Sequence, residues 1–154
     1  MGGTSTSTSN VDTGAGTLTL GGTVGMQISK NAGTADLIQG VTTLTDGGTL
    51  TVSNLAGTLA AGDSFTLFNA ANYAGTFAAF NLPSLSPGLA WDTSKLAVNG
   101  TIRVAALPAV TVSPAATNII YGSSVTFTAD ATGTAPLSYQ WQEDGMSLSG
   151  ATNS

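Results

Sequence analysis

Short runs in which apolar and polar residues alternate, each ended by glycine or another turn residue, most constrain the fold of this chain. In the first such stretch the apolar positions are separated by Thr, Gly, Gln or Ser; they are Leu18, Leu20, Val24, Met26 and Ile28. A period of two places successive side chains on opposite faces of a strand, whereas a helix needs a period near 3.6. From Thr17 onward the sequence therefore predicts half-buried β-strands.

The same pattern continues to Val104 and predicts at least eight short strands before residue 105. Turn dipeptides such as Asp46-Gly47 and Asn99-Gly100 separate the runs. Later strands are expected at 64–68, 76–80, 88–91, 95–98 and 101–104. A small-residue turn followed by an alternating strand recurs at roughly 20-residue steps, which favours a solenoid or stacked sheet.

Composition excludes several classes of function. The 154 residues include no His and no Cys, so histidine general bases, Ser-His-Asp and Cys-His systems, thiolate zinc sites and disulfides are ruled out. The net charge is −5, and Lys30, Lys95 and Arg103 form no basic run. Nucleic-acid binding needs several cations on one face, so it is not expected. No apolar stretch is long enough to insert into a membrane, and none of the motifs indicates a cofactor.

The carboxylates are interpreted as structural rather than catalytic. Those considered are Asp36, Asp46, Asp63, Asp92, Asp130, Glu143 and Asp144. Paired carboxylates could hydrolyse a glycoside, but most of these residues flank glycines or strand starts, where a carboxylate caps a turn. The Gly-Gly-x-Gly-x-Asp pattern of calcium-binding repeats is absent. We therefore predict no catalytic residue, no metal site and no enzymatic activity.

Two aromatic residues outside the C-terminal part are candidates for ligand binding. Trp91 and Tyr73 could stack against a sugar ring, because an aromatic side chain presents a flat apolar face. Packing against the core, or capping the last repeat, is the alternative that we favour, since Trp is buried on average. The sequence leaves both roles open.

Residues from about 14 to 105 resemble the end of autotransporter-associated β-strand repeat proteins. The resemblance rests on the segments 18–22, 48–52, 59–68, Gly88-Leu89-Ala90-Trp91-Asp92-Thr93-Ser94 and Asn99-Gly100-Thr101-Ile102. Those proteins are large bacterial surface or secreted proteins. The resemblance implies a right-handed parallel β-helix for this region.

The tail resembles the first half of a bacterial immunoglobulin-like domain. Gly122-Ser123-Ser124 would open strand B, with Val125, Phe127 and Ala129 pointing one way, and Trp141 would be the buried tryptophan of strand C. Ala129 occupies the usual strand B cysteine position. The later strands of such a domain do not follow, so we expect the chain to be a fragment of a longer polypeptide.

Together these features predict an all-β chain with three parts: a flexible lead-in over 1–16, a parallel β-helix or solenoid end over 17–105, and a truncated immunoglobulin-like half-sandwich over 106–154. The resemblances imply a non-catalytic structural or adhesive segment of a bacterial secreted or cell-surface protein. The alternative is a carbohydrate-binding module, or a non-catalytic part of a polysaccharide-degrading enzyme. Glycans or other surface proteins are the expected partners, together with self-association through exposed strand edges.

Overall fold

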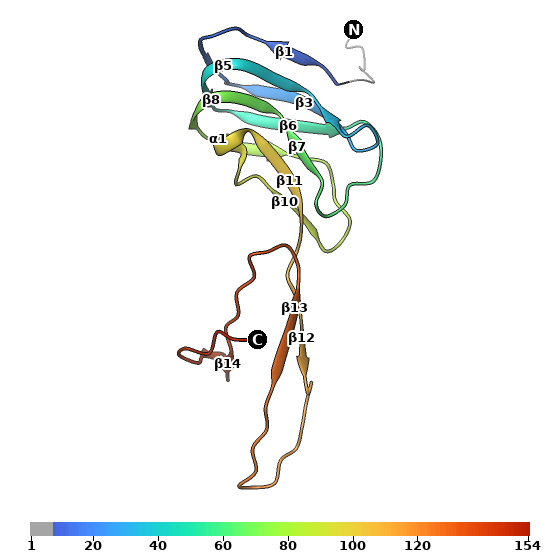
Figure 1. Cartoon of the computed structure of the whole chain (residues 1–154), viewed down its shortest axis with the longest axis vertical. Helices are drawn as coiled ribbons and strands as arrows, with labels where there is room; N and C mark the ends of the chain where they lie inside the picture. Colours follow the sequence, from blue (N-terminus) through green and yellow to red (C-terminus); the bar gives the residue numbers. More distant parts are fainter. Residues whose placement is uncertain (1–7) are drawn as a thin grey trace. The chain divides into compact units, whose positions relative to one another are not determined.

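The computed structural model describes residues 8–154, which divide into two compact units between Ala105 and Ala106. The first unit carries strands β1 to β11 and one short helix, and the second carries β12 to β15 (Figure 1). Almost all the regular structure is strand, so the predicted all-β class is confirmed. None of the sheets closes on itself.

The first sheet of the N-terminal unit is built around β5 (Leu37–Asp46). One neighbour of β5 is β8 (Phe68–Gly75), and the others are β1 (Asn10–Asp12) and β2 (Thr17–Thr19); all three run parallel to β5. Part of the predicted flexible lead-in thus forms a strand, while residues 1–7 of it lie outside the described residues.

The second sheet has the order β4-β3-β6-β9. Strands β3 (Thr23–Ser29), β6 (Thr49–Asn54) and β9 (Ala79–Asn81) are parallel, and β4 (Thr34–Ala35) pairs antiparallel with the end of β3. Along the chain, β2, β5 and β8 of the first sheet therefore alternate with β3, β6 and β9 of the second (Figure 1).

This alternation makes each repeat longer than the sequence pattern indicates. Thr23 pairs with Thr49, which is 26 residues later (49 − 23), and Thr49 pairs with Ala79, 30 residues later (79 − 49). The predicted step of roughly 20 residues is therefore too short. One repeat contributes a strand to each of two sheets, together with the turns between them. A step measured from one turn and strand to the next is therefore shorter than the full repeat.

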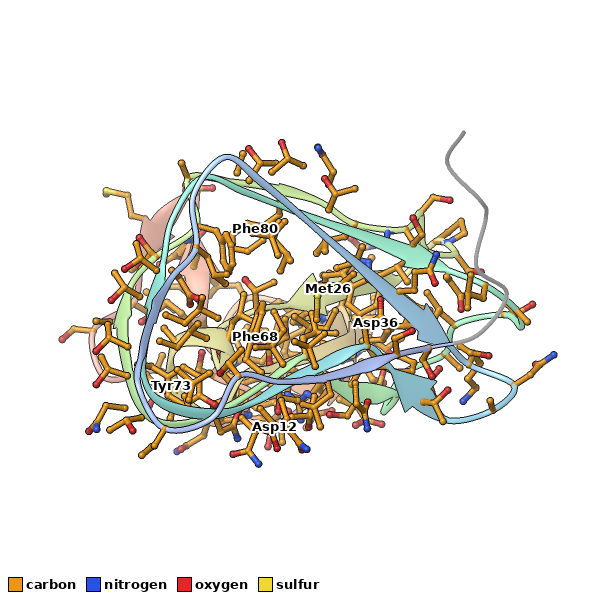
Figure 2. The ribbon with its side chains drawn as sticks, turned by 90° about the horizontal axis from the view of Figure 1, so that it is seen from above. Asp12, Met26, Asp36, Phe68, Tyr73 and Phe80 are labelled. Carbon is orange, nitrogen blue, oxygen red and sulfur yellow. The ribbon has the colours of Figure 1, made fainter. Side chains whose placement is uncertain are left out.

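The core of the first unit lies between these strands. Its buried apolar side chains are Met26, Ile28, Val41, Leu44, Leu50, Val52, Leu59, Phe65, Leu67, Phe68, Phe77, Leu96, Ile102 and Val104. Figure 2 shows Met26 and Phe68 inside the ring of strands. The rings of Phe68 and Phe77 stack with their centroids 6.0 Å apart. Burial of this alternating set is what selects the register, because a shift of one residue would turn every side chain to the opposite face.

A third sheet, β10-β11-β7, completes the unit. It consists of β10 (Leu89–Asp92), β11 (Thr101–Ala106) and β7 (Ser64–Thr66), and β11 runs antiparallel to β7. The strand predicted at 95–98 is wrong, because Leu96–Asn99 forms the short helix α1. Asn99-Gly100 is accordingly no hairpin turn: Gly100 caps this helix with φ 73°, and a Cβ there would collide with the carbonyl oxygen of Phe68.

The second unit contains two small antiparallel sheets, β12 (Ala109–Ser113) with β13 (Thr128–Thr132) and β14 (Gln142–Glu143) with β15 (Met146–Ser147). None of the residues from 106 to 154 is buried. Trp141, predicted as a buried core residue, is only half-buried, and its indole N–H donates to the carbonyl oxygen of Asn153 at 2.8 Å. The predicted burial of Trp141 in a core is therefore wrong.

Candidate functional site

Trp91, a sequence-predicted ligand-binding residue, lies on β10 and is half-buried against the core. Its indole N–H donates to the carbonyl oxygen of Pro83 at 2.8 Å. The polar edge of the ring thus fixes the loop that precedes β10. A buried indole normally finds such a partner, so this hydrogen bond accounts for the residue without a ligand.

Tyr73, the other predicted ligand-binding residue, lies on β8 in the first sheet. Its hydroxyl donates to the carbonyl oxygen of Phe68 and accepts a hydrogen bond from the backbone N–H of Ala70, both at 3.1 Å. Tyr73 also pairs in register with Leu44 and packs against the core. Tyr73 and Trp91 belong to different sheets, and the structure does not unite them in one site.

Four carboxylates, Asp12, Asp36, Asp63 and Asp92, accept hydrogen bonds from the backbone, and two of them also form ion pairs. Asp36 accepts hydrogen bonds from the backbone N–H groups of Ser9 at 2.6 Å and Gln27 at 2.7 Å. Asp92 accepts from the backbone N–H of Ser94 at 3.0 Å and pairs with Arg103 at 3.1 Å. The hydrogen bonds from Ser94, with that from Arg103, hold the pKa of Asp92 below its usual value.

Asp63 forms the second ion pair, with Lys30, and also accepts from the backbone N–H of Ala60 at 2.9 Å. Burial raises its pKa, but the hydrogen bonds from Lys30 and Ala60 outweigh this effect and leave the pKa lowered. Asp12, which the sequence analysis did not consider, accepts from the backbone N–H of Gly14 at 3.0 Å. These carboxylates support turns and strand ends.

Asp46 is the buried carboxylate among the described residues. Only 5% of it is exposed, and one carboxylate oxygen, Oδ1, has no hydrogen-bond partner among the described residues. Burial raises its pKa to about 6. Asp46 follows Leu44 by two positions on β5 and therefore points to the same face, toward the core. That spacing is a signal that could have predicted its burial from the sequence.

Across residues 8–154, the structure brings no three potential metal-ligating side chains together. A small polar depression of about 220 Å³ lies over the third sheet, where Lys95 and Arg103 gather beside Asp92. Since Arg103 is already paired with Asp92, Lys95 supplies the remaining positive charge there.

The most apolar cavity lies within the second unit and measures about 410 Å³. Val110 and Val112 of β12 and Ala129 and Ala131 of β13 form one wall. The segment 136–141 forms the other and contributes Leu137, Tyr139 and Trp141. The sequence analysis assigned Trp141 to a buried core, but in the structure its ring lines this open cavity.

Comparisons of the chain with protein-family models, with curated proteins and with solved structures found no match. No helix within the described part of the chain has the length and hydropathy to span a membrane.

Proposed function

We propose that the chain is a non-catalytic structural or adhesive segment of a bacterial secreted or cell-surface repeat protein. In this proposal the first unit belongs to a parallel β-helix and the second to an immunoglobulin-like domain. The observation that supports it best is the in-register parallel stacking of strands 26 to 30 residues apart in two sheets. Such stacking serves to extend a chain, because each repeat contacts only its neighbours.

The side chains of the stacked strands support the same role. Val24, Leu50 and Phe80 occupy one register position of the second sheet, and Leu18, Leu44 and Tyr73 occupy one position of the first. Stacked apolar side chains and the threonines of these strands favour a scaffold, since neither set brings reactive groups together.

The cavity of the second unit supports the immunoglobulin-like interpretation. Ala129, in the strand B cysteine position, and Trp141, in the strand C tryptophan position, line the same cavity. In immunoglobulin-like domains these two positions pack against each other. Carbohydrate binding through Trp91 or Tyr73 remains the alternative function. It is less well supported because both polar ring groups are engaged with backbone.

One experiment separates the two functions. The purified chain is incubated with neutral and acidic polysaccharides. Release of cleavage products is followed by assaying reducing ends and by ultraviolet absorbance. Retention of the chain is then measured on the same polysaccharides coupled to beads. The proposal predicts neither products nor retention. Retention that is lost in Trp91→Ala, with an unchanged circular dichroism spectrum, would overturn it in favour of a carbohydrate-binding module.

A companion arm tests the scaffold role itself. The chain is placed between a bacterial surface anchor and an epitope tag, and the rate at which a protease releases the tag from intact cells is compared with that of a fusion carrying Leu44→Asp. Because Leu44 is fully buried in the stack, the charged variant should unfold the spacer and speed the release of the tag. Equal release rates in the two fusions would contradict the proposal.

A further inference from the structure

The central three residues of each strand in the second unit's larger sheet read the same in both directions. Strand β12 reads Ala-Val-Thr-Val-Ser around Thr111, and β13 reads Thr-Ala-Asp-Ala-Thr around Asp130. They pair only with each other among the described strands, so each has one outer edge with unpaired backbone groups. Such edges bind further strands unless charges or prolines block them.

The sheet is also too small to be stable by itself. An isolated two-stranded sheet is marginal in water, and three or more strands with a common apolar face are needed for independent stability. Val110 of β12 is 64% exposed on the face that lines the apolar cavity. An added strand would extend this face and cover part of its edge.

The charge pattern selects one edge for self-pairing. The segment from 104 to 129 contains no charged residue, and β12 lies inside it. An antiparallel pair of β12 strands, centred on Thr111, would place neutral threonines opposite each other and each valine opposite a valine. The same arrangement of β13 would set Asp130 against Asp130, and like charges directly opposite are destabilising.

We infer that the chain forms a two-fold symmetric dimer in which β12 pairs antiparallel with β12 of a second copy. The combined sheet has the order β13-β12-β12-β13, with Val110 opposite the second copy's Val112. A two-fold axis perpendicular to the sheet keeps both valine faces on the same side, so the apolar surface becomes continuous. The contact is isologous, and Asp130 at the outer edges prevents further addition, so the assembly closes at two chains.

Sedimentation velocity over a range of concentrations gives the first test. The full chain should show a reversible monomer–dimer equilibrium. Thr111→Asp sets two carboxylates opposite each other across the contact and should raise the dissociation constant at least about tenfold. The new carboxylate also lies opposite Asp130 of its own chain, so the far-ultraviolet circular dichroism spectrum is recorded to show that the β12–β13 sheet persists. Thr132→Asp, which adds a carboxylate opposite Ala109 on the same sheet, is the control for added charge and should leave the dimer intact. A chain that is monomeric at all concentrations, or a dimer that survives Thr111→Asp, overturns the inference.

Cross-linking gives a second test that does not depend on a destabilising charge. The chain has no cysteine, so a single introduced thiol reports one position only. Opposed residues of antiparallel strands have Cα atoms about 4.5–5.5 Å apart, within the range that a disulfide bridges. Thr111→Cys should therefore form a disulfide-linked dimer under mild oxidation, whereas Thr132→Cys should not. Equal cross-linking of the two variants would show that another surface makes the contact.

The role of Asp130 in limiting the assembly to two chains gives a third test. Asp130→Thr removes the carboxylate from the outer edge of β13 and gives that strand the neutral centre that β12 has. With two self-complementary edges per chain, association should continue past the dimer to larger species. Unchanged dimers in Asp130→Thr would contradict the role assigned to this carboxylate.

Discussion

Asp46 ends β5 directly opposite Gly75 of β8, and a Cβ on Gly75 would collide with the carbonyl oxygen of Asp46. The buried carboxylate thus lies where the backbones of two neighbouring repeats approach closely. Asp and Gly are both depleted in strands, so propensity alone does not predict a strand at either position. Their pairing has consequences for stability that can be measured.

Replacing the buried carboxylate should stabilise the chain at neutral pH. The pKa of Asp46 is raised to about 6 from 3.8, so the protonated form is favoured in the folded state. Its stabilising contribution is complete below pH 3.8 and is lost as the pH rises through about 6. A shift of this size is worth about 3 kcal/mol between these limits. Asp46→Asn should raise the free energy of unfolding at pH 7 relative to the wild type and flatten this part of the pH profile, as measured by urea denaturation.

Asp63→Asn is the matched control for this experiment. The pKa of Asp63 is lowered, so its contribution is present at neutral pH and is lost as the pH falls below the unfolded value. The two variants should therefore change the pH profile in opposite directions. If the free energy of unfolding of Asp46→Asn changed with pH between 4 and 7 just as that of the wild type does, the raised pKa of Asp46 would be contradicted.

Gly75→Ala should destabilise the first unit more than an equivalent change in an open position. Gly75 has a φ of 69°, which costs an L-residue about 1–2 kcal/mol, and the new Cβ would also meet the backbone of Asp46. Gly22→Ala is the control, because Gly22 has a φ of 65° and nothing within 4 Å of the added Cβ. Thermal unfolding should show a larger loss for Gly75→Ala. Equal losses would mean that the two strands do not approach as described.

Leu50→Ala should cost about 2–5 kcal/mol, the range for removing a fully buried leucine side chain. Leu50 has no exposed surface and pairs with Val24 on one side and Phe80 on the other. Leu107→Ala, at a position that is 50% exposed, should cost far less. Chemical denaturation of both variants measures the difference. A small effect at Leu50 would place it outside the core.

Trp91→Phe tests whether the indole is structural. The substitution keeps most of the ring but removes the N–H that donates to Pro83, and it should lower stability by about 0.5–1.5 kcal/mol. Denaturation monitored by far-ultraviolet circular dichroism gives the value. A variant as stable as the wild type would leave the hydrogen bond without a role and would favour ligand binding by Trp91.

The alternation of apolar and polar residues predicted the strand class well, because burial of one face determines it locally. It did not predict the repeat length, since Thr23 and Thr49 become neighbours only when the intervening strand, β5, joins the other sheet. The same limit applies to the helix that starts at Leu96. Its four residues carry no helical period, and its end at Gly100 has the same Asn-Gly signal as a hairpin.

The candidate site was harder to predict, because hydrogen bonding and burial depend on contacts distant in sequence. Trp91 and Tyr73 were correctly considered for core packing, but their partners Pro83 and Phe68 could not be identified from spacing. Asp46 was interpreted as a turn residue because glycine follows it. Asp46 lies two residues after Leu44, which places its carboxylate on the buried face of the strand. This spacing was a stronger signal for burial than the following glycine was for a turn.

The central claim is that strands of successive repeats pair in parallel. Backbone nuclear Overhauser contacts in the isotope-labelled chain test it most directly. The account predicts contacts between Val24 and Leu50 and between Leu50 and Phe80, as expected for parallel neighbours. Contacts that instead connect β5 and β6 as an antiparallel hairpin around Gly47 and Gly48 would contradict it.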